Sequence, residues 1–232
     1  MSTTTQINHQ KINVSGFSLV ELMVAMMIGT LALGTLLTVF ASTVSTNKTI
    51  LENIHLHQEL RIIFDIMARD IRRTGYWALA ENSPINTLNP FGIVELTDTC
   101  IRYSYDIDKD GRVNSNKDIF GFRLNKKTIE VSINGRKCNQ TRWEDLTDLN
   151  TLIIKQTETQ TGKTPIFQLN TECLNISQTG NKTCTAATPG DLLIKSSTLL
   201  INLTGVLKKD PDTEFSLASS ITLPNHQALK IH

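Results

Sequence analysis

The chain is organised around one stretch, GFSLVELMVAMMIGTLALGTLLTVFA at residues 16–41. Residues 22–47 carry no ionisable side chain, and residues 22–41 are predominantly apolar. As an α-helix, an apolar run of this length rises roughly 30 Å, which matches the hydrocarbon thickness of a bilayer. The 232-residue chain has no second run of this kind. We therefore expect one membrane-spanning helix near the N-terminus, before a large polar remainder.

The apolar run does not have the features of a secretory signal peptide. It exceeds the apolar core of such peptides, about 7 to 15 residues, and no small-residue cleavage site follows it. Lys11 is the only charged residue before Glu21, so the basic region is thin. Glu21 itself has two interpretations. It either lies at the level of the lipid headgroups, or it is an intramembrane carboxylate with a function.

The residues around Glu21 resemble the class III signal of type IV prepilins and pseudopilins. Glycine, phenylalanine, a hydroxyl residue, leucine, any residue and glutamate stand before an uninterrupted apolar helix. The resemblance implies that residues 1–16 are a leader peptide and that a prepilin peptidase cuts after Gly16. It also implies that the new N-terminal Phe17 is methylated and that Glu21 is retained. The helix would then stay in the membrane after the cut.

Glu21 carries an expectation about assembly. The new amine at Phe17 is a cation one helical turn away. The Glu21 carboxylate cannot pair well with this amine of its own chain and also keep the membrane free of water. The carboxylate can instead pair with the amine of a neighbouring subunit in the core of a helical filament. There the attraction acts in a low dielectric and offsets the desolvation of both charges. The resemblance implies the same role.

The helix is expected to continue well beyond the apolar run. Apolar residues recur at helical steps of three and four, at Ile50, Leu51, Ile54, Leu60, Ile63, Phe64, Met67 and Ile71. Gly75 is a plausible stop. We expect one helix over about residues 17–74. Residues 17–47 would form the transmembrane or filament-core part, and residues 48–76 an amphipathic part that continues into the globular domain.

A narrower resemblance involves the end of this helix. Residues 68–77, ARDIRRTGYW, resemble the helix end of PilW-type minor pilins and, more loosely, that of J-type minor pseudopilins of type II secretion. Many major pilins have a proline about twenty residues into the mature helix, whereas the first proline here is Pro84. The family implies an α+β fold, with a long N-terminal α-helix packed on a C-terminal antiparallel β-sheet domain.

The residues after the helix have the pattern of a β-rich globular domain, residues 77–232. Short strands are expected at residues 100–105, 119–124, 128–133, 151–156 and 191–194. Residues 198–207 and 214–223 alternate apolar and polar, and residues 208–212 between them indicate a hairpin turn. Residues 81–90 and 158–189 are rich in Asn, Thr, Ser and Pro, so they are expected to be loops.

One acidic loop matches the D-x-D-x-D-G opening of a calcium loop. The expected ligands are the side chains of Asp106, Asp108 and Asp110, the carbonyl of Arg112, and Asn114 directly or through water. Position 12 holds Lys117 instead of glutamate, and Asp118 comes one residue late as a shifted last ligand. The flanking segments are strands, so the loop is not an EF-hand. A weak calcium site and an ion-free acidic turn both remain open.

The four cysteines are Cys100, Cys138, Cys173 and Cys184. They form no CxxC motif, so zinc and thioredoxin-type chemistry are not expected. An even number of cysteines in a domain outside the cytoplasm favours disulfides. Three pairings are possible, and we favour Cys100–Cys138 with Cys173–Cys184, because the first bracket the acidic loop and the second are close in a polar segment.

Composition and motifs argue against several other functions. A net charge of +1 gives no basic footprint for nucleic acid. The five histidines form no credible metal or catalytic set, and GxGxxG, P-loop, HExxH and GxSxG motifs are missing. We therefore expect no enzyme.

The expected function is that of a PilW-like minor pilin that helps to initiate, prime or cap a type IV pilus. Its partners would be prepilin peptidase, other minor pilins and the major pilin. It would cross the inner membrane once, with the globular domain in the periplasm or at the pilus tip on the cell surface. The alternatives are a tip-displayed adhesin or ligand-binding module, and a J-type minor pseudopilin of type II secretion.

Overall fold

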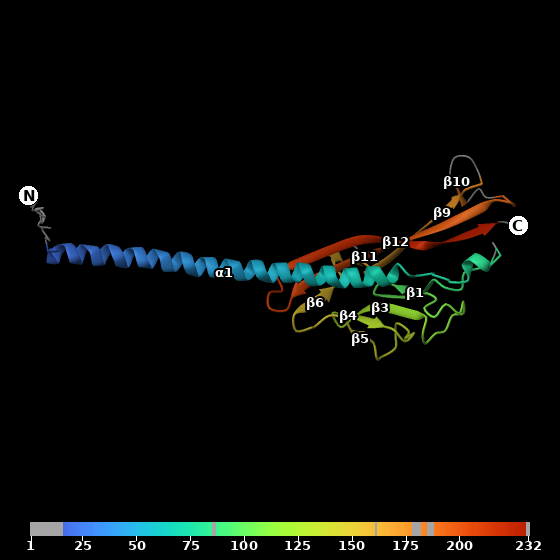
Figure 1. Ribbon diagram of the computed structural model, residues 1–232, viewed down its shortest axis with the longest axis horizontal. Coiled ribbons are helices and arrows are strands. Elements are labelled where there is room, and N and C mark those ends of the chain that lie inside the picture. Colours follow the sequence, from blue (N-terminus) through green and yellow to red (C-terminus); the bar gives the residue numbers. More distant parts are fainter. Residues whose placement is uncertain (1–15, 85–86, 161, 178–181, 185–187, 231–232) are drawn as a thin grey trace, which may run out of the picture. The chain divides into compact units, whose positions relative to one another are not determined.

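The computed structural model describes residues 16–84, 87–160, 162–177, 182–184 and 188–230. The chain divides into two compact units, residues 1–51 and 52–232. Only one helix of appreciable length is present in the described ranges, α1, Leu19–Ile71, and it contributes to both units (Figure 1). The second unit holds the β-strands and a short 3₁₀ turn, η1, Ala80–Asn82.

In the first unit, α1 has no covered face. Every described side chain from residue 16 to residue 51 is exposed. Six threonine hydroxyls in this part donate hydrogen bonds to backbone carbonyls three or four residues earlier. The threonines are Thr30, Thr35, Thr38, Thr43, Thr46 and Thr49. These bonds satisfy the hydroxyl groups within the helix, so a surrounding apolar medium meets few open polar groups.

In the second unit, α1 buries one stripe. The buried residues recur at helical spacing and are Leu56, Leu60, Ile63, Met67, Ala68 and Ile71. After Ile71 the chain turns, and Gly75 adopts a φ of 75°, which a glycine tolerates without strain. The Gly75 amide donates to the carbonyl of Ser104, 2.9 Å away, which ties the helix end to a strand.

The first sheet is an antiparallel meander in the order β1-β2-β3-β4-β5. Its strands are β1, Ile93–Thr97; β2, Cys100–Ser104; β3, Ile119–Asn125; β4, Thr128–Ser132; and β5, Glu144–Asp145. Lys126 and Lys127 between β3 and β4 both have positive φ values, as a two-residue hairpin turn of type I′ requires. The acidic loop connects β2 to β3.

The second sheet has the order β10-β9-β11-β12, and β6 pairs with the edge of β11 beyond β9. Its strands are β6, Leu152–Lys155; β9, Phe167–Asn175; β10, Lys182–Thr183; β11, Leu192–Leu207; and β12, Glu214–Lys230. A separate small pair is formed by β7, Glu158–Thr159, and β8, Gly162–Lys163. The β11–β12 hairpin contains the two strands expected at residues 198–207 and 214–223, but both are longer. The strand expected separately at residues 191–194 is the start of β11, and β12 continues to Lys230.

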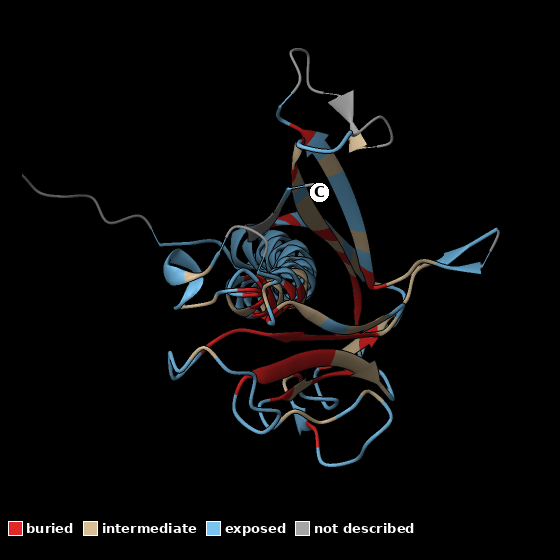
Figure 2. Ribbon diagram, turned by 90° about the vertical axis from the view of Figure 1, so that its right-hand side faces the viewer, coloured by how far each residue is buried: buried red, intermediate tan, exposed pale blue. Residues whose placement is uncertain are grey.

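The core lies where the stripe of α1 meets both sheets. The first sheet contributes Ile101, Tyr103, Phe122 and Ile129, and the second contributes Ile154, Phe167, Leu199, Ile201, Leu203 and Ile221. Figure 2 shows the buried residues on the first sheet and on the part of the second sheet nearest to it, while the far ends of β9 and β11 are mostly exposed or half-buried. The packing is close, because a Cβ atom on Gly205 of β11 would stand 2.8 Å from Cδ1 of Leu60.

The structure confirms the α+β fold, but one expectation is wrong. Residues 158–189 were expected to be loops, yet β9 lies in this segment and pairs with nine residues of β11 from Leu193 to Ile201. Only the ends of β9, Phe167 and Asn175, are buried, and Gln168, Asn170, Thr171 and Glu172 are exposed. A polar strand of this kind is held by its neighbour's backbone, which leaves no apolar alternation in the sequence.

Candidate functional site

The processing motif precedes the helix. Gly16, Phe17 and Ser18 lie outside regular structure, and α1 begins at Leu19. The Phe17 side chain is 82% exposed. Apart from Gly16 and its chain neighbours, no described residue has an atom within 4 Å of the place where a Cβ atom of Gly16 would stand. The peptide bond between these two residues is therefore open to an enzyme. The expected leader peptide also includes residues 1–15, which lie outside the described residues.

Glu21 lies in the first turn of α1. A carboxylate there interacts favourably with the positive end of the helix dipole. Its side chain is exposed, and no ion pair of Glu21 occurs among the described residues. The charge is therefore available to a cation on another molecule.

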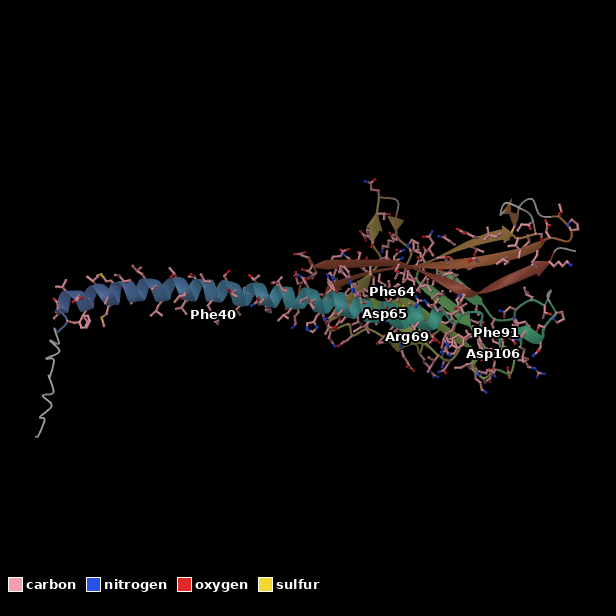
Figure 3. The ribbon with its side chains drawn as sticks, turned by 45° about the horizontal axis from the view of Figure 1, so that its top comes forward. Phe40, Phe64, Asp65, Arg69, Phe91 and Asp106 are labelled. Carbon is pink, nitrogen blue, oxygen red and sulfur yellow. A yellow bond between two sulfur atoms is a disulfide. The ribbon has the colours of Figure 1, made fainter. Side chains whose placement is uncertain are left out.

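The acidic loop is built around a buried carboxylate. Asp106 is 1% exposed, and its Oδ2 accepts hydrogen bonds from the backbone N–H of Ala78 and of Gly111, both at 3.1 Å. Its backbone N–H donates to the carbonyl of Tyr76 at 2.9 Å. Its Oδ1 is buried and has no hydrogen-bond partner among the residues that the structure describes. Figure 3 labels Asp106 in the second unit.

Two further carboxylates meet Asp106. Asp106, Asp108 and Asp110 each place a carboxylate oxygen within 4.8 Å of the other two. Asp108 and Asp110 are exposed. The Lys117 ammonium lies 3.4 Å from Oδ2 of Asp108, and Oδ1 of Asp110 accepts the backbone N–H of Arg112 at 2.8 Å. The loop therefore brings three carboxylates together, and Lys117 forms an ion pair with one of them. Lys109 and Arg112 also place positive charge in this loop.

The remaining predicted ligands lie differently. Asp118 is fully buried, and its two oxygens accept the backbone N–H groups of Ile107, at 3.3 Å, and Asn114, at 2.7 Å. Asp118 is not among the three grouped carboxylates. The Asn114 side chain accepts the backbone N–H of Asn116 at 3.0 Å, and Arg112 is exposed. Asp118 and Asn114 thus fix the backbone of the loop.

Two disulfides join the four cysteines. Cys100 of β2 pairs with Cys138 in the loop after β4, and the Cα atoms are 6.0 Å apart. Cys173 of β9 pairs with Cys184, with a Cα separation of 5.6 Å. These pairings are the ones that the sequence favoured. The first lies at the core, since Cys100 is buried, whereas Cys173 is only half-buried.

One polar cluster was missed from the sequence. Asp70, near the end of α1, accepts hydrogen bonds from the hydroxyls of Tyr103, at 2.5 Å, and Tyr105, at 3.1 Å. The Arg73 guanidinium lies 4.2 Å from the centroid of the Tyr105 ring. Burial, followed by the charge of Asp70, raises the pKa of Tyr103 well above its usual value, and the pKa of Tyr105 is raised for the same reasons. The only sequence signal was the spacing of two residues between Tyr103 in β2 and Tyr105 just after it, which places both side chains on one face.

Comparisons with known proteins match nearly the whole chain. The family model described as prepilin peptidase-dependent protein B matches residues 49–223. The model described as the prokaryotic N-terminal methylation motif matches residues 11–37, which include the stretch around Gly16 and Glu21. A search of the curated proteins and a search of the solved structures found no match. The two matches include α1 except residues 38–48, and the β-rich unit up to residue 223.

Proposed function

The chain belongs to the prepilin peptidase-dependent protein B family, and on that basis we propose that it is a PilW-like minor pilin that helps to initiate, prime or cap a type IV pilus. The role is structural, and other proteins act on the chain. Its partners would be prepilin peptidase, other minor pilins and the major pilin. It would be held in the inner membrane by one helix, with its β-rich unit in the periplasm.

Processing follows from the motif. Prepilin peptidase would remove residues 1–16 by cutting between Gly16 and Phe17, and the new Phe17 amine would be methylated. Residues 17–47 would then be the transmembrane and filament-core helix, and residues 48–76 the amphipathic part. Residues 77–232 would form the globular domain. The exposed, irregular backbone at the cut supports this division.

The observation that carries the proposal is the uncovered apolar part of α1. Its residues are apolar on all sides, and none from residue 22 to residue 51 is buried. A helix that is apolar all round needs surroundings that are apolar all round, such as a bilayer or a bundle of like helices. A pilin uses both environments in turn, first the membrane and then the filament core.

Glu21 would favour the transfer of the helix from the membrane into the filament core. In the filament core its carboxylate would pair with the Phe17 amine of a neighbouring subunit. A carboxylate with no partner in its own chain is costly to bury, so pairing in low dielectric favours the assembled state and fixes the register. In the membrane the same carboxylate can stay at the headgroup level.

Glu21→Val tests this step. We expect the variant to insert and to be cleaved, because the substitution only adds apolarity. It should fail to restore pili in cells that lack the wild-type gene, and it should no longer co-purify with other pilins. Glu172→Val, which removes an exposed carboxylate from β9, is the matched control and should restore pili.

The outcomes separate the candidate functions. Normal pili and normal co-purification with Glu21→Val would contradict the pairing. Loss of protein secretion with intact pili, on deletion of the gene, would assign the chain to type II secretion as a pseudopilin. Intact pili with lost cell attachment would favour a tip adhesin. A copy number close to that of the major pilin would contradict the minor role.

A further inference from the structure

We propose that the loop between β2 and β3 binds a calcium ion through carboxylate oxygens of Asp106, Asp108 and Asp110, and that the ion fixes the segment following α1 to this loop. The site is independent of the pilus function proposed above. It is carried by two observations, the convergence of three carboxylates and an unpartnered buried oxygen on one of them.

The buried oxygen is the stronger observation. Within the described part of the chain, Oδ1 of Asp106 has no hydrogen-bond partner although the residue is 1% exposed. Leaving a carboxylate oxygen buried and unpaired costs free energy, because its hydration is lost without replacement. Oδ2 of the same group already accepts two backbone N–H groups, so the carboxylate is held in place. An ion bound at the free oxygen would supply the missing partner.

The spacing of the carboxylates suits calcium. Oxygens that share one calcium ion at about 2.3 to 2.6 Å can lie up to roughly 5 Å apart, and the three carboxylates here lie within 4.8 Å. Calcium also accepts irregular sets of oxygen ligands, whereas magnesium demands near-octahedral geometry. Without a cation, three carboxylates at this separation repel one another.

The neighbouring residues define what the ion must displace. Lys117 stands at position 12 of the loop, where a calcium loop supplies a bidentate glutamate, and its ammonium lies 3.4 Å from Asp108. It therefore competes with the ion for one ligand. Asp118 serves as a positioning residue, because its oxygens hold the backbone at Ile107 and Asn114. The missing ligand and the competing cation predict a weak site, with a Kd of about 10⁻⁴ to 10⁻³ M.

The ion would act on the end of the helix through Asp106. The Asp106 carboxylate accepts the N–H of Ala78, and its backbone N–H donates to Tyr76. Both partners lie in the segment that leaves α1. Binding only to the folded loop stabilises the folded state by mass action. Calcium should therefore order the connection between α1 and the first sheet.

The test uses the mature full chain in detergent micelles. We expect its Tm to rise in millimolar calcium, to rise much less in equal magnesium, and to fall back with a chelator. The combined Asp108→Asn and Asp110→Asn variant should lose the rise, because it removes two ligand charges from exposed side chains. The Oδ1 of asparagine can still accept the Arg112 backbone N–H, so the loop should keep its local structure. Asp212→Asn, which removes an exposed carboxylate from the β11–β12 turn, should keep it.

Terbium, which replaces calcium, gives a second readout. The indole nitrogen of Trp77 lies 3.3 Å from the place where a Cβ atom of Gly111 would stand, so this ring is next to the loop. Terbium emission sensitised by tryptophan should appear in the wild type. It should be lost when calcium displaces the bound terbium. Trp77→Phe should reduce the emission and keep the calcium-dependent rise in Tm.

Lys117→Glu is the decisive variant, because it removes the competing cation and supplies the twelfth ligand. We expect it to tighten calcium binding by about tenfold or more. No calcium-dependent change in Tm in the wild type together with unchanged binding in Lys117→Glu would overturn the proposal. A rise in Tm that persists in the double Asn variant would also overturn it, since the ion would then bind elsewhere.

Discussion

The two parts of α1 are equally helical but differ in what covers them. Residues 19–51 have no buried side chain, whereas residues 52–71 have six. In the second part charged residues such as Asp65 and Arg69 separate the apolar positions, and both are labelled on the helix in Figure 3. The difference shows that the distribution of apolar residues around a helix predicts what packs against it. An apolar stripe is buried by the two sheets of its own unit. A helix that is apolar all round needs apolar surroundings on every side, and the described residues of this chain do not supply them.

The largest expected effect is a block of cleavage before the first part of α1. Gly16→Arg should abolish cleavage, because a bulky charged side chain would occupy the scissile position. The chain should then keep residues 1–16 in cells that process their major pilin. Intact mass of the purified protein measures this. Gly29→Ala is the control and should be cleaved, since a Cβ atom there meets no atom within 4 Å. Normal cleavage of Gly16→Arg would show that the cut lies elsewhere.

The next prediction compares one substitution in the two parts. Leu60→Ala should destabilise the β-rich unit by about 2 to 5 kcal/mol, because Leu60 is fully buried against β11 and its loss leaves a cavity. Leu37→Ala should leave the free energy of unfolding of that unit unchanged, since Leu37 is 67% exposed. Denaturant unfolding in micelles, followed by tryptophan fluorescence, measures both. Equal effects of the two substitutions would contradict the division of α1.

The sequence predicted those parts of the fold that have an apolar period. The helix was expected over residues 17–74 and is found at Leu19–Ile71, and the β11–β12 hairpin follows alternating residues. In contrast, β9 alternates too weakly to be recognised, and β5 is only two residues long. Strands of this kind are defined by backbone pairing with a neighbour that is distant in sequence, which local patterns do not record.

The candidate sites divide in the same way. The processing motif around Gly16 is contiguous, so its residues could be named directly from the sequence. The carboxylates of Asp106, Asp108 and Asp110 were also named from local spacing, and the structure brings them together. The burial of Asp118 could not be foreseen, because it depends on how the loop folds back on itself. The contacts of Asp70 with two tyrosines could not be foreseen either, because they depend on how α1 meets the end of β2.

The two disulfides are expected to contribute differently to the stability of the second unit. Cys100→Ser opens a bridge over 38 residues at the core and should destabilise the unit by about 3 to 4 kcal/mol, mostly through the entropy of the unfolded chain. Cys173→Ser opens a bridge over 11 residues at the mostly exposed end of β9. It should mainly increase local proteolysis and leave the main unfolding transition nearly unchanged. Peptide mapping of the non-reduced protein should recover both pairs, and four free thiols would contradict the assignment.

The smallest effect concerns the polar contact at the end of α1. Tyr103→Phe removes a hydrogen bond to the Asp70 carboxylate and should cost about 1.5 to 3 kcal/mol at neutral pH. Burial and Asp70 raise the folded-state pKa of Tyr103 above the unfolded value of about 10. The phenol is therefore neutral in both states below pH 10. Above that pH only the unfolded chain ionises, so stability falls as the pH rises, by at most about 1.4 kcal/mol per unit for this group.

Unfolding free energies measured between neutral pH and pH 11 test this dependence. Tyr103→Phe should reduce the alkaline loss of stability, and the pair Tyr103→Phe with Tyr105→Phe should reduce it further, because burial and Asp70 also raise the pKa of Tyr105. Tyr76→Phe is the control, and that variant should keep the alkaline loss because it retains both tyrosines of the cluster. If the double variant lost stability with rising pH as steeply as the wild type, the two tyrosines that contact Asp70 would not be the cause of the alkaline loss.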